Sequence, residues 1–523
     1  MQNDNTKFHD KQFLALTVGK IAGLLLTFAI PVFLSRFLSK SDYGVYAQFN
    51  MFEGLLAGVL NCSMGSGLYY FYARLTKRQF CSMVGNCFAG YLFLCLIGYL
   101  FLRLTPCGEL IMGNSPVINI MNLLFIATFC TLCTHLMSPF YVVTEDNRIA
   151  LLYPTLEIII RCTATITIAC AVGGLKGVIA GIMAARGLTL LFVISYMVIK
   201  SRNWLQTSNS EKADITKKQR WYDLLLNWKI FVKQFRYTIP LAVSATLGVI
   251  VIRLDKIICV SYMDSAEYAI YAVAFLAIPG ISQVQSSIAE VCLTGMSRCF
   301  KNNDPHGALE LLKQLEYKAL SFSTPLVFAA ILYADHAISF IYSAKYIDSA
   351  PYFRVFILST LFEMVASGLI TRASGNTKIS LYTSIVSFII TLPVTFFAVK
   401  SYGAWGGIFS VLITSLVQRF AYVFYEIRIV DANLAMYLPW RKLGKIFAAS
   451  LLAGAPFAIL RLYYNFNMFI SGLLAVIYII SVYYIEMRMN TFIVGNDTAV
   501  KYINGILHKL KSLFLFRHIR QRI

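Results

Sequence analysis

The sequence predicts an all-α polytopic membrane protein with about 14 transmembrane helices. Apolar stretches that reach or approach the ~20 residues needed for a helix to cross a bilayer recur along the 523-residue chain. Most Lys and Arg residues lie in every second gap between these stretches, as expected of cytoplasmic loops. The chain is 58% hydrophobic and only 14% charged, whereas a soluble domain usually has about 25% charged residues.

The gaps between the apolar stretches predict the topology. Basic gaps lie at 72–79, 200–236 and 426–445, and the intervening gaps carry few Lys and Arg residues. The positive-inside rule therefore places these basic gaps and both termini on the cytoplasmic side of the cytoplasmic (inner) membrane. The predicted spans are 13–35, 43–71, 80–102, 116–143, 150–172, 176–199, 237–262, 266–292, 317–341, 352–371, 379–399, 403–425, 446–463 and 466–485.

The chain repeats itself at an offset of 225 to 230 residues. The segment 42–46 (DYGVY) matches 267–271 (EYAIY), and Asn147-Arg148 matches Thr377-Lys378. The Gly-x-x-Gly that begins at Gly174 matches the one that begins at Gly403. Each repeat holds six spans, so both repeats start from the same side of the membrane. They are therefore expected to be related by an axis along the membrane normal.

The repeat divides the chain into five predicted parts. Residues 1–200 form an N-lobe of spans 1–6, and residues 237–430 form a C-lobe of spans 7–12, giving two six-helix lobes in parallel pseudo-twofold repeat with a cavity between them. Residues 431–490 form an appended helix pair, spans 13–14. The loop 201–236 and the tail 491–523 mix Lys and Arg with large apolar residues, which suits amphipathic segments that bind anionic membrane lipids.

Composition and motifs exclude several functions. The net charge of +21 does not indicate nucleic-acid binding, because the cations follow the cytoplasmic gaps instead of gathering on one soluble face. The sequence has no Walker phosphate loop and no His-Glu-x-x-His motif. No long non-cytoplasmic loop is available to house a catalytic site. The chain is not expected to be an enzyme or to bind a metal or cofactor, and its 12 cysteines are expected to be small packing residues.

Ionisable residues inside the spans mark candidate functional sites, because a charged side chain at the bilayer centre costs about 2.5–3.5 kcal/mol on insertion scales. Arg253, Asp255 and Lys256 lie within four residues and cannot all face lipid. A wet cavity is favoured for this cluster, with an ion network between packed helices as the alternative. Glu157 and Arg161 are spaced i, i+4, so they are expected to pair on one helix face.

Cations also lie in corresponding spans of the two repeats. Arg186 and Arg419 each follow the matched glycines by ten or so residues, so both lobes are expected to offer a cation to the cavity. Guanidinium groups bind phosphate in a bidentate way, and the cavity therefore favours an anionic ligand. The predicted substrate-binding cations are Arg161, Arg186, Arg253, Lys256 and Arg419.

Three segments carry a resemblance to a known family: 42–46, its repeat 267–271, and the stretch from Pro240 through Arg253-Leu-Asp-Lys-Ile-Ile. They resemble the Wzx-type flippases of the multidrug/oligosaccharidyl-lipid/polysaccharide exporter superfamily. The resemblance covers nearly the whole chain, with Ala269 where the first repeat has Gly44. It implies alternating-access translocation of oligosaccharide repeat units, linked to a polyprenyl (undecaprenyl) diphosphate, for O-antigen (lipopolysaccharide) or capsule synthesis.

The resemblance also implies roles and partners. The diphosphate and sugars would enter the cationic cavity while the prenyl tail stays in lipid. Asp255, Glu157 and Glu53 are the ion-coupling candidates, because a proton or a sodium ion can neutralise a carboxylate. Polysaccharide polymerase and chain-length proteins are the implied protein partners.

Other functions fit the same architecture. A multidrug cation antiporter would favour acidic and aromatic cavity residues, whereas cations outnumber acids in these spans. A peptidoglycan-lipid flippase would be essential for growth. A membrane polymerase or ligase needs a longer non-cytoplasmic loop than this chain offers, and a scaffold for a glycan-assembly complex is a further alternative.

Overall fold

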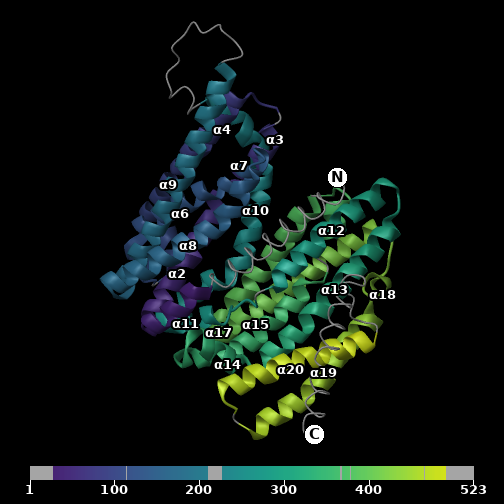
Figure 1. Ribbon diagram of the computed structural model, residues 1–523. Coiled ribbons are helices and arrows are strands. Elements are labelled where there is room, and N and C mark those ends of the chain that lie inside the picture. Colours follow the sequence, from purple (N-terminus) through teal and green to yellow (C-terminus); the bar gives the residue numbers. More distant parts are fainter. Residues whose placement is uncertain are drawn as a thin grey trace, which may run out of the picture. The chain divides into compact units, whose positions relative to one another are not determined.

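The computed structural model describes residues 28–72, 74–113, 115–209, 227–278, 280–365, 368–376, 378–464 and 466–489 (Figure 1). These ranges are helical, with turns between the helices and no β-strand within them. Eight of the described helical segments are long and apolar enough to cross a membrane. The predicted all-α membrane fold is therefore confirmed. Most of the first predicted span, the middle of the loop 201–236 and the tail 491–523 lie outside the described residues.

The first repeat begins with a short apolar helix at Phe28–Phe37, which is the end of the first predicted span. Predicted spans 2–6 follow, and several of these spans are divided into two or more helices. These are α2 (Lys40–Leu60), α3 (Met64–Tyr72), α4 (Lys77–Leu104), α5 (Cys107–Met112), η1 (Pro116–Ile120), α6 (Met121–His135), α7 (Met137–Val143), α8 (Asn147–Val172) and α9 (Gly174–Asn209).

The second repeat has the same order of elements. It contains α10 (Trp228–Tyr262), α11 (Ser265–Val273), α12 (Ile281–Lys301), α13 (Pro305–Leu332), α14 (Ala334–Tyr342), η3 (Ala344–Ser349), α15 (Ala350–Glu363), α16 (Leu369–Ala373) and α17 (Lys378–Ile429). The chain continues with α18 (Leu434–Tyr437), α19 (Trp440–Tyr463) and α20 (Met468–Arg488). Helices α9 and α10 extend into the predicted loop 201–236 from both sides.

Matching caps start the corresponding helices. Ser39 caps α2 by accepting the backbone N–H of Asp42, and Asp264 caps α11 by accepting the N–H of Glu267. Helices α4 and α13 are both 28 residues long, and a side-chain cap starts each of them. A polar side chain at this position satisfies backbone donors that the helix itself leaves without a partner. The repeat found in the sequence is thus also a repeat of capped helix starts.

Glycines mark the turn that ends the fifth span of each repeat. Gly173 and Gly174 separate α8 from α9 with φ values of 82° and 58°. Gly403 bends α17 with a φ of 54° and a ψ of −129°, so this 52-residue helix holds the two predicted spans 379–399 and 403–425. A positive φ is open to glycine at little cost because glycine has no Cβ.

Several predicted spans are broken helices. The span 43–71 is interrupted at Cys62 and Ser63, whose φ values are 46° and 50°, and the span 266–292 is interrupted around Gly280. Irregular backbone at membrane depth is tolerated only where protein or a water-filled cavity surrounds it. Apolar periodicity alone does not reveal such breaks.

The described residues form two compact units. Unit 1 holds the described residues within 1–276, 334–359 and 378–421. Unit 2 holds those within 277–333, 360–377 and 422–523. The two six-helix lobes remain a prediction of the sequence.

Helix α2 lies at the centre of unit 1 and packs against α6, α9, α10 and α11. It crosses α11 at Gly44, where an added Cβ would lie only 1.6 Å from the carbonyl oxygen of Ser265. Such an approach of two helix backbones requires glycine. The ring of the neighbouring Tyr43 packs against Tyr342 and Tyr346 of α14 and η3.

Further contacts join the two repeats within unit 1. Arg36 donates hydrogen bonds to the carbonyl oxygens of Phe340 and Ile341 in α14. In the opposite direction, Lys345 of η3 donates to the carbonyl oxygen of Leu38. Both contacts lie at the ends of spans that face the predicted non-cytoplasmic side. They tie the start of the first repeat to the middle of the second.

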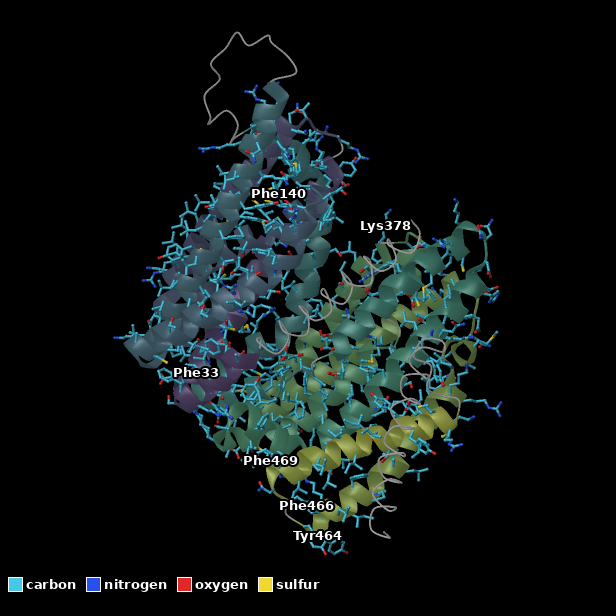
Figure 2. All side chains as sticks on the ribbon, viewed as in Figure 1. Phe33, Phe140, Lys378, Tyr464, Phe466 and Phe469 are labelled. Carbon is cyan, nitrogen blue, oxygen red and sulfur yellow. The ribbon has the colours of Figure 1, made fainter. Side chains whose placement is uncertain are left out.

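Helix α10 lies along helices of the first repeat over its whole length. At its start Gln234 donates to the carbonyl oxygen of Met64, and near its end Ser261 lies against Gly113. At the predicted cytoplasmic end of unit 1, the ring of Phe140, which is labelled in Figure 2, stacks on the rings of Phe80 and Trp204. Aromatic packing therefore joins α4, α7 and α9 at this end of the first repeat.

Unit 2 is built around α13. Helix α13 packs against α12, α16, α19 and α20. In Figure 1, α13 lies between α12 and the pair of α19 and α20. Glu426 and Glu486 are both fully buried in this unit and hydrogen-bonded. Glu426 accepts from both the backbone N–H and the hydroxyl of Thr371, and Glu486 accepts from the hydroxyl of Ser321 at 2.7 Å.

The crossing of α2 and α11 gives a first prediction. The Gly44→Ala variant should lose about 1–3 kcal/mol of stability or more, because the new methyl group overlaps a backbone oxygen that can move only with its helix. The control is Gly248→Ala on α10, where an added Cβ meets nothing within 4 Å. Thermal unfolding of both variants in detergent tests this. Equal unfolding temperatures for both would contradict the crossing.

Candidate substrate-binding site

An ion pair on α2 organises the interior of the first repeat. Glu53 of α2 is 3% exposed, and its Oε1 lies 2.9 Å from Nη2 of Arg186 on α9. The hydroxyl of Thr131 on α6 donates to the same oxygen at 2.5 Å. Three helices are thus joined at one carboxylate. A charge inside the membrane domain requires such partners, because leaving it alone would cost several kcal/mol.

Beside this ion pair lies a pocket of about 210 Å³. Two guanidinium groups line it, those of Arg161 on α8 and Arg186 on α9. The Nε atom of each is buried and has no hydrogen-bond partner within the described part of the chain. The full lining consists of Ile30, Pro31, Tyr46, Asn50, Arg161, Thr165, Ile182, Ala185 and Arg186.

The charge of this pocket favours an anion. Glu53 balances the charge of Arg186, and Arg161 forms no ion pair with another described residue. A buried guanidinium with unused donors is most readily satisfied by an anionic oxygen acceptor. We name this site the arginine pocket.

Arg253 approaches α2 from another helix. Its Nη1 donates to the carbonyl oxygen of Met51 at 3.3 Å, and its guanidinium lies over Gly54, where an added Cβ would be 2.6 Å from Nη2. Because Glu53 and Gly54 are neighbours on α2, Arg186 and Arg253 contact adjacent parts of the surface of this helix. Arg253 is not among the residues that line the arginine pocket.

Asp255 lies in a packed network. It is 5% exposed, and its Oδ2 accepts from the hydroxyl of Tyr271 at 2.6 Å and lies 3.3 Å from Nζ of Lys256. The ammonium group of Lys256 also lies 3.7 Å from the ring centre of Phe275, a cation–π contact. This part of the cluster matches the alternative that the sequence left open, an ion network between helices.

The expected pair of Glu157 and Arg161 is not formed, and Arg419 lies outside the arginine pocket. Glu157 and Arg161 form no ion pair, although both are described; Arg161 lines the arginine pocket instead. Helical spacing permits an i, i+4 pair but does not require one, and the neighbouring helix α9 gives Arg161 a different environment. Arg419 lies on α17 and is not part of this lining. The pocket brings together two of the five predicted cations.

Sequence reasoning missed the uncharged polar residues of the site. Tyr46 and Asn50 line the pocket, and together with Glu53 they follow the i, i+4, i+7 spacing of one helix face. A polar stripe in an otherwise apolar span was the signal that could have revealed them. The described residues contain no group of three or more His, Cys, Asp or Glu side chains suited to a metal ion.

Comparison with solved structures identifies the class of fold. The chain is 17% identical to a structure of the lipid II flippase MurJ in an inward closed conformation, covering 91% of this chain and 98% of that one with a TM-score of 0.65. It is 12% identical to an inward-facing multidrug resistance MATE family transporter of the MOP superfamily, covering 78% and 94% with a TM-score of 0.56. The fold is that of these flippases and transporters, which are not enzymes.

The family follows from the sequence. The model of a family described as polysaccharide biosynthesis protein matches residues 33–351, more than half of the chain. The chain belongs to this family of multi-pass membrane proteins. It is also 22% identical over 335 residues to an uncharacterised membrane protein of Methanocaldococcus jannaschii, covering 62% of this chain and 76% of the relative.

The ion pair on α2 gives a second prediction. Glu53→Gln or Arg186→Gln alone should cost about 3–5 kcal/mol, because each leaves a buried charge without its partner. The double variant should be more stable than either single variant. Thermal unfolding of the four proteins measures this coupling.

The ion pair of Glu310 and Lys313, whose carboxylate is exposed, is the matched control for this cycle. Glu310 is 64% exposed, so its variants should change stability by only about 0–1 kcal/mol. Losses that simply add in the Glu53 and Arg186 double variant would show that the two charges do not compensate each other.

Proposed function

We propose that this protein is a flippase that moves polyprenyl-diphosphate-linked oligosaccharides across the cytoplasmic membrane, with both termini in the cytoplasm. The arginine pocket is the observation that carries the proposal. It holds two guanidinium groups inside a membrane domain, and their Nε donors are unused within the described chain. The family of polysaccharide biosynthesis proteins and the fold shared with a lipid II flippase support a lipid-linked saccharide as the substrate.

The chemistry of a diphosphate suits this pocket. A diphosphate offers several anionic oxygens, and the planar guanidinium group donates to two such oxygens at once. Arg161 is the principal candidate for this contact, since it forms no ion pair with a described side chain. An organic cation, the substrate of the alternative multidrug antiporter, would meet two guanidinium groups there, and only that of Arg186 is balanced by a carboxylate.

Glu53 gives the site a means of responding to substrate. An anionic ligand competes with Glu53 for Arg186, because both place oxygen atoms against the same guanidinium. A Glu53 carboxylate that has lost Arg186 is a buried charge without its partner. Binding a proton or a sodium ion then costs less free energy than leaving that charge unpaired. Substrate binding and ion binding would then be linked at α2, which also contacts α11 of the second repeat.

The proposal includes a place in the cell. The substrate would be an undecaprenyl-diphosphate-linked repeat unit for O-antigen or capsule, handed to polymerase and chain-length proteins after translocation. Basic segments at the predicted cytoplasmic side would bind anionic lipids. Asp255 and Glu157 remain further ion-coupling candidates, and Arg253, Lys256 and Arg419 remain candidate substrate contacts along the route.

Deleting the gene tests the function. A flippase deletion should abolish surface polysaccharide and trap the lipid-linked intermediate in the cytoplasmic leaflet, where an external glycan-specific probe does not reach it. An intermediate exposed on the outer leaflet would instead indicate a polymerase. Loss of viability would favour the peptidoglycan-lipid flippase. Unchanged polysaccharide with new sensitivity to cationic dyes would favour the drug antiporter.

Arg161 gives a third prediction. Returning Arg161→Ala to the deletion strain should restore at most about one tenth of the wild-type surface polysaccharide, because a charge-assisted hydrogen bond contributes about 1.5–3 kcal/mol. Arg161→Lys keeps the charge but not the planar guanidinium group, so it should restore an amount of surface polysaccharide between that of Arg161→Ala and that of the wild type. The thermal unfolding temperature of both variants should stay close to that of the wild type.

The control for these variants is Arg103→Ala, an exposed cation at the end of α4 that lies outside the pocket. It should restore the wild-type amount of surface polysaccharide. Full restoration by Arg161→Ala would remove Arg161 from the proposed site.

A further inference from the structure

A second pocket in unit 1 has a different chemistry. Its volume is about 500 Å³, within the range of small-molecule sites. Hydroxyl, amide and carboxylate groups dominate its lining, and no Lys, Arg or His side chain takes part. The lining residues are Ser41, Gln48, Ser115, Pro116, Ser261, Tyr262, Met263, Asp264, Ser265 and Ala266.

A buried polar pair forms part of the wall. Gln48 is 1% exposed and Ser115 is 2% exposed, and the hydroxyl of Ser115 donates to Oε1 of Gln48 at 2.7 Å. This hydrogen bond uses the amide oxygen of Gln48, so the amide nitrogen is the group that Gln48 offers to a ligand acceptor at the pocket wall.

Two further side chains suit a polyhydroxyl ligand. Tyr262 is 46% exposed, and its ring is held edge-on against Phe396 with centroids 6.1 Å apart, which makes it a rigid amphipathic surface. One carboxylate oxygen of Asp264 accepts the backbone N–H of Glu267 at 2.8 Å. Its other oxygen remains open to hydroxyl donors of a ligand.

The two pockets divide the chemistry of a glycolipid between them. The arginine pocket offers cations, whereas this pocket offers neutral hydrogen-bonding groups and one carboxylate, which would repel a diphosphate. It lies where α2 begins, and α2 and α3 lead from there to the basic gap at 72–79. The pocket therefore lies at the end of the spans that faces the predicted non-cytoplasmic side.

We propose that this pocket is an exit-side saccharide subsite, which binds the glycan of the substrate and not its diphosphate. The proposal rests on the proposed function for its physiological ligand. Its residues come from both repeats: Ser41, Gln48 and Ser115 from the first, and 261–266 from the second. Any movement between α2 and α11 would change the distance between the two walls, so the subsite would hold the glycan only in some states of the transport cycle.

Binding of disaccharides to the purified full-length protein in nanodiscs tests the subsite directly. The probes are maltose, lactose and N,N′-diacetylchitobiose, followed by saturation-transfer difference NMR, with sodium diphosphate as competitor. At least one disaccharide should bind, and diphosphate should not displace it. Gln48→Met keeps the shape of the side chain but not the amide, so it should raise the Kd for the disaccharide about 2–10-fold, which corresponds to the loss of one hydrogen bond.

Ser261→Ala is the second variant, because it removes a partly exposed hydroxyl without disturbing a buried pair; it should weaken binding to a similar degree. The control is Ser481→Ala, an exposed hydroxyl of α20 that bonds only its own helix. Absence of binding by all three disaccharides would overturn the subsite. Unchanged affinity in both pocket variants, or displacement by diphosphate, would also overturn it.

The gene deletion separates this proposal from the function on which it rests. An intermediate trapped in the cytoplasmic leaflet, together with no disaccharide binding, would leave the flippase standing and remove the subsite. Disaccharide binding that depends on Gln48 and Ser261, in a protein whose deletion leaves surface polysaccharide unchanged, would keep the saccharide site and remove the flippase.

Discussion

The cost of a charge inside a membrane domain is the constraint on which the rest of this structure depends. Glu53 and Arg186 meet it by pairing at 2.9 Å, with Thr131 completing the coordination of the carboxylate. The pair fixes α2 against α6 and α9, and the space beside it becomes the arginine pocket. The same constraint makes Arg161 informative, because it lies in that pocket without forming an ion pair with another described residue.

Helix α2 links this site to the second repeat. Glycine at position 44 lets α2 cross α11 at backbone distance, and the contacts of Arg36 and Lys345 join the repeats at the same end. A change in the ion pairing of Glu53 therefore acts on a helix that both repeats hold. Alternating access requires such a connection between substrate contacts and helix packing.

The sequence predicted the fold well, because the fold depends on features that residue types show directly. These features are the length of the apolar spans, the distribution of Lys and Arg between the gaps, and the repeat at an offset of 225 to 230 residues. It predicted the site less well. The breaks at Cys62 and Ser63 depend on tertiary packing, and helical spacing could not show that Arg161 lines a pocket together with Arg186 and forms no ion pair with Glu157. The sequence favoured a wet cavity for the cluster that contains Asp255, and only the hydrogen bond from Tyr271 shows this carboxylate in a packed network.

The central claim is that the arginine pocket recognises the diphosphate of a lipid-linked substrate. The most direct measurement is the affinity of the purified protein for undecaprenyl diphosphate and for undecaprenyl monophosphate, by native mass spectrometry, in the wild type and in Arg161→Ala. The account predicts that the wild type binds the diphosphate at least about tenfold more tightly and that the variant loses this preference. Equal affinity for the two lipids in the wild type, unchanged in the variant, would contradict it.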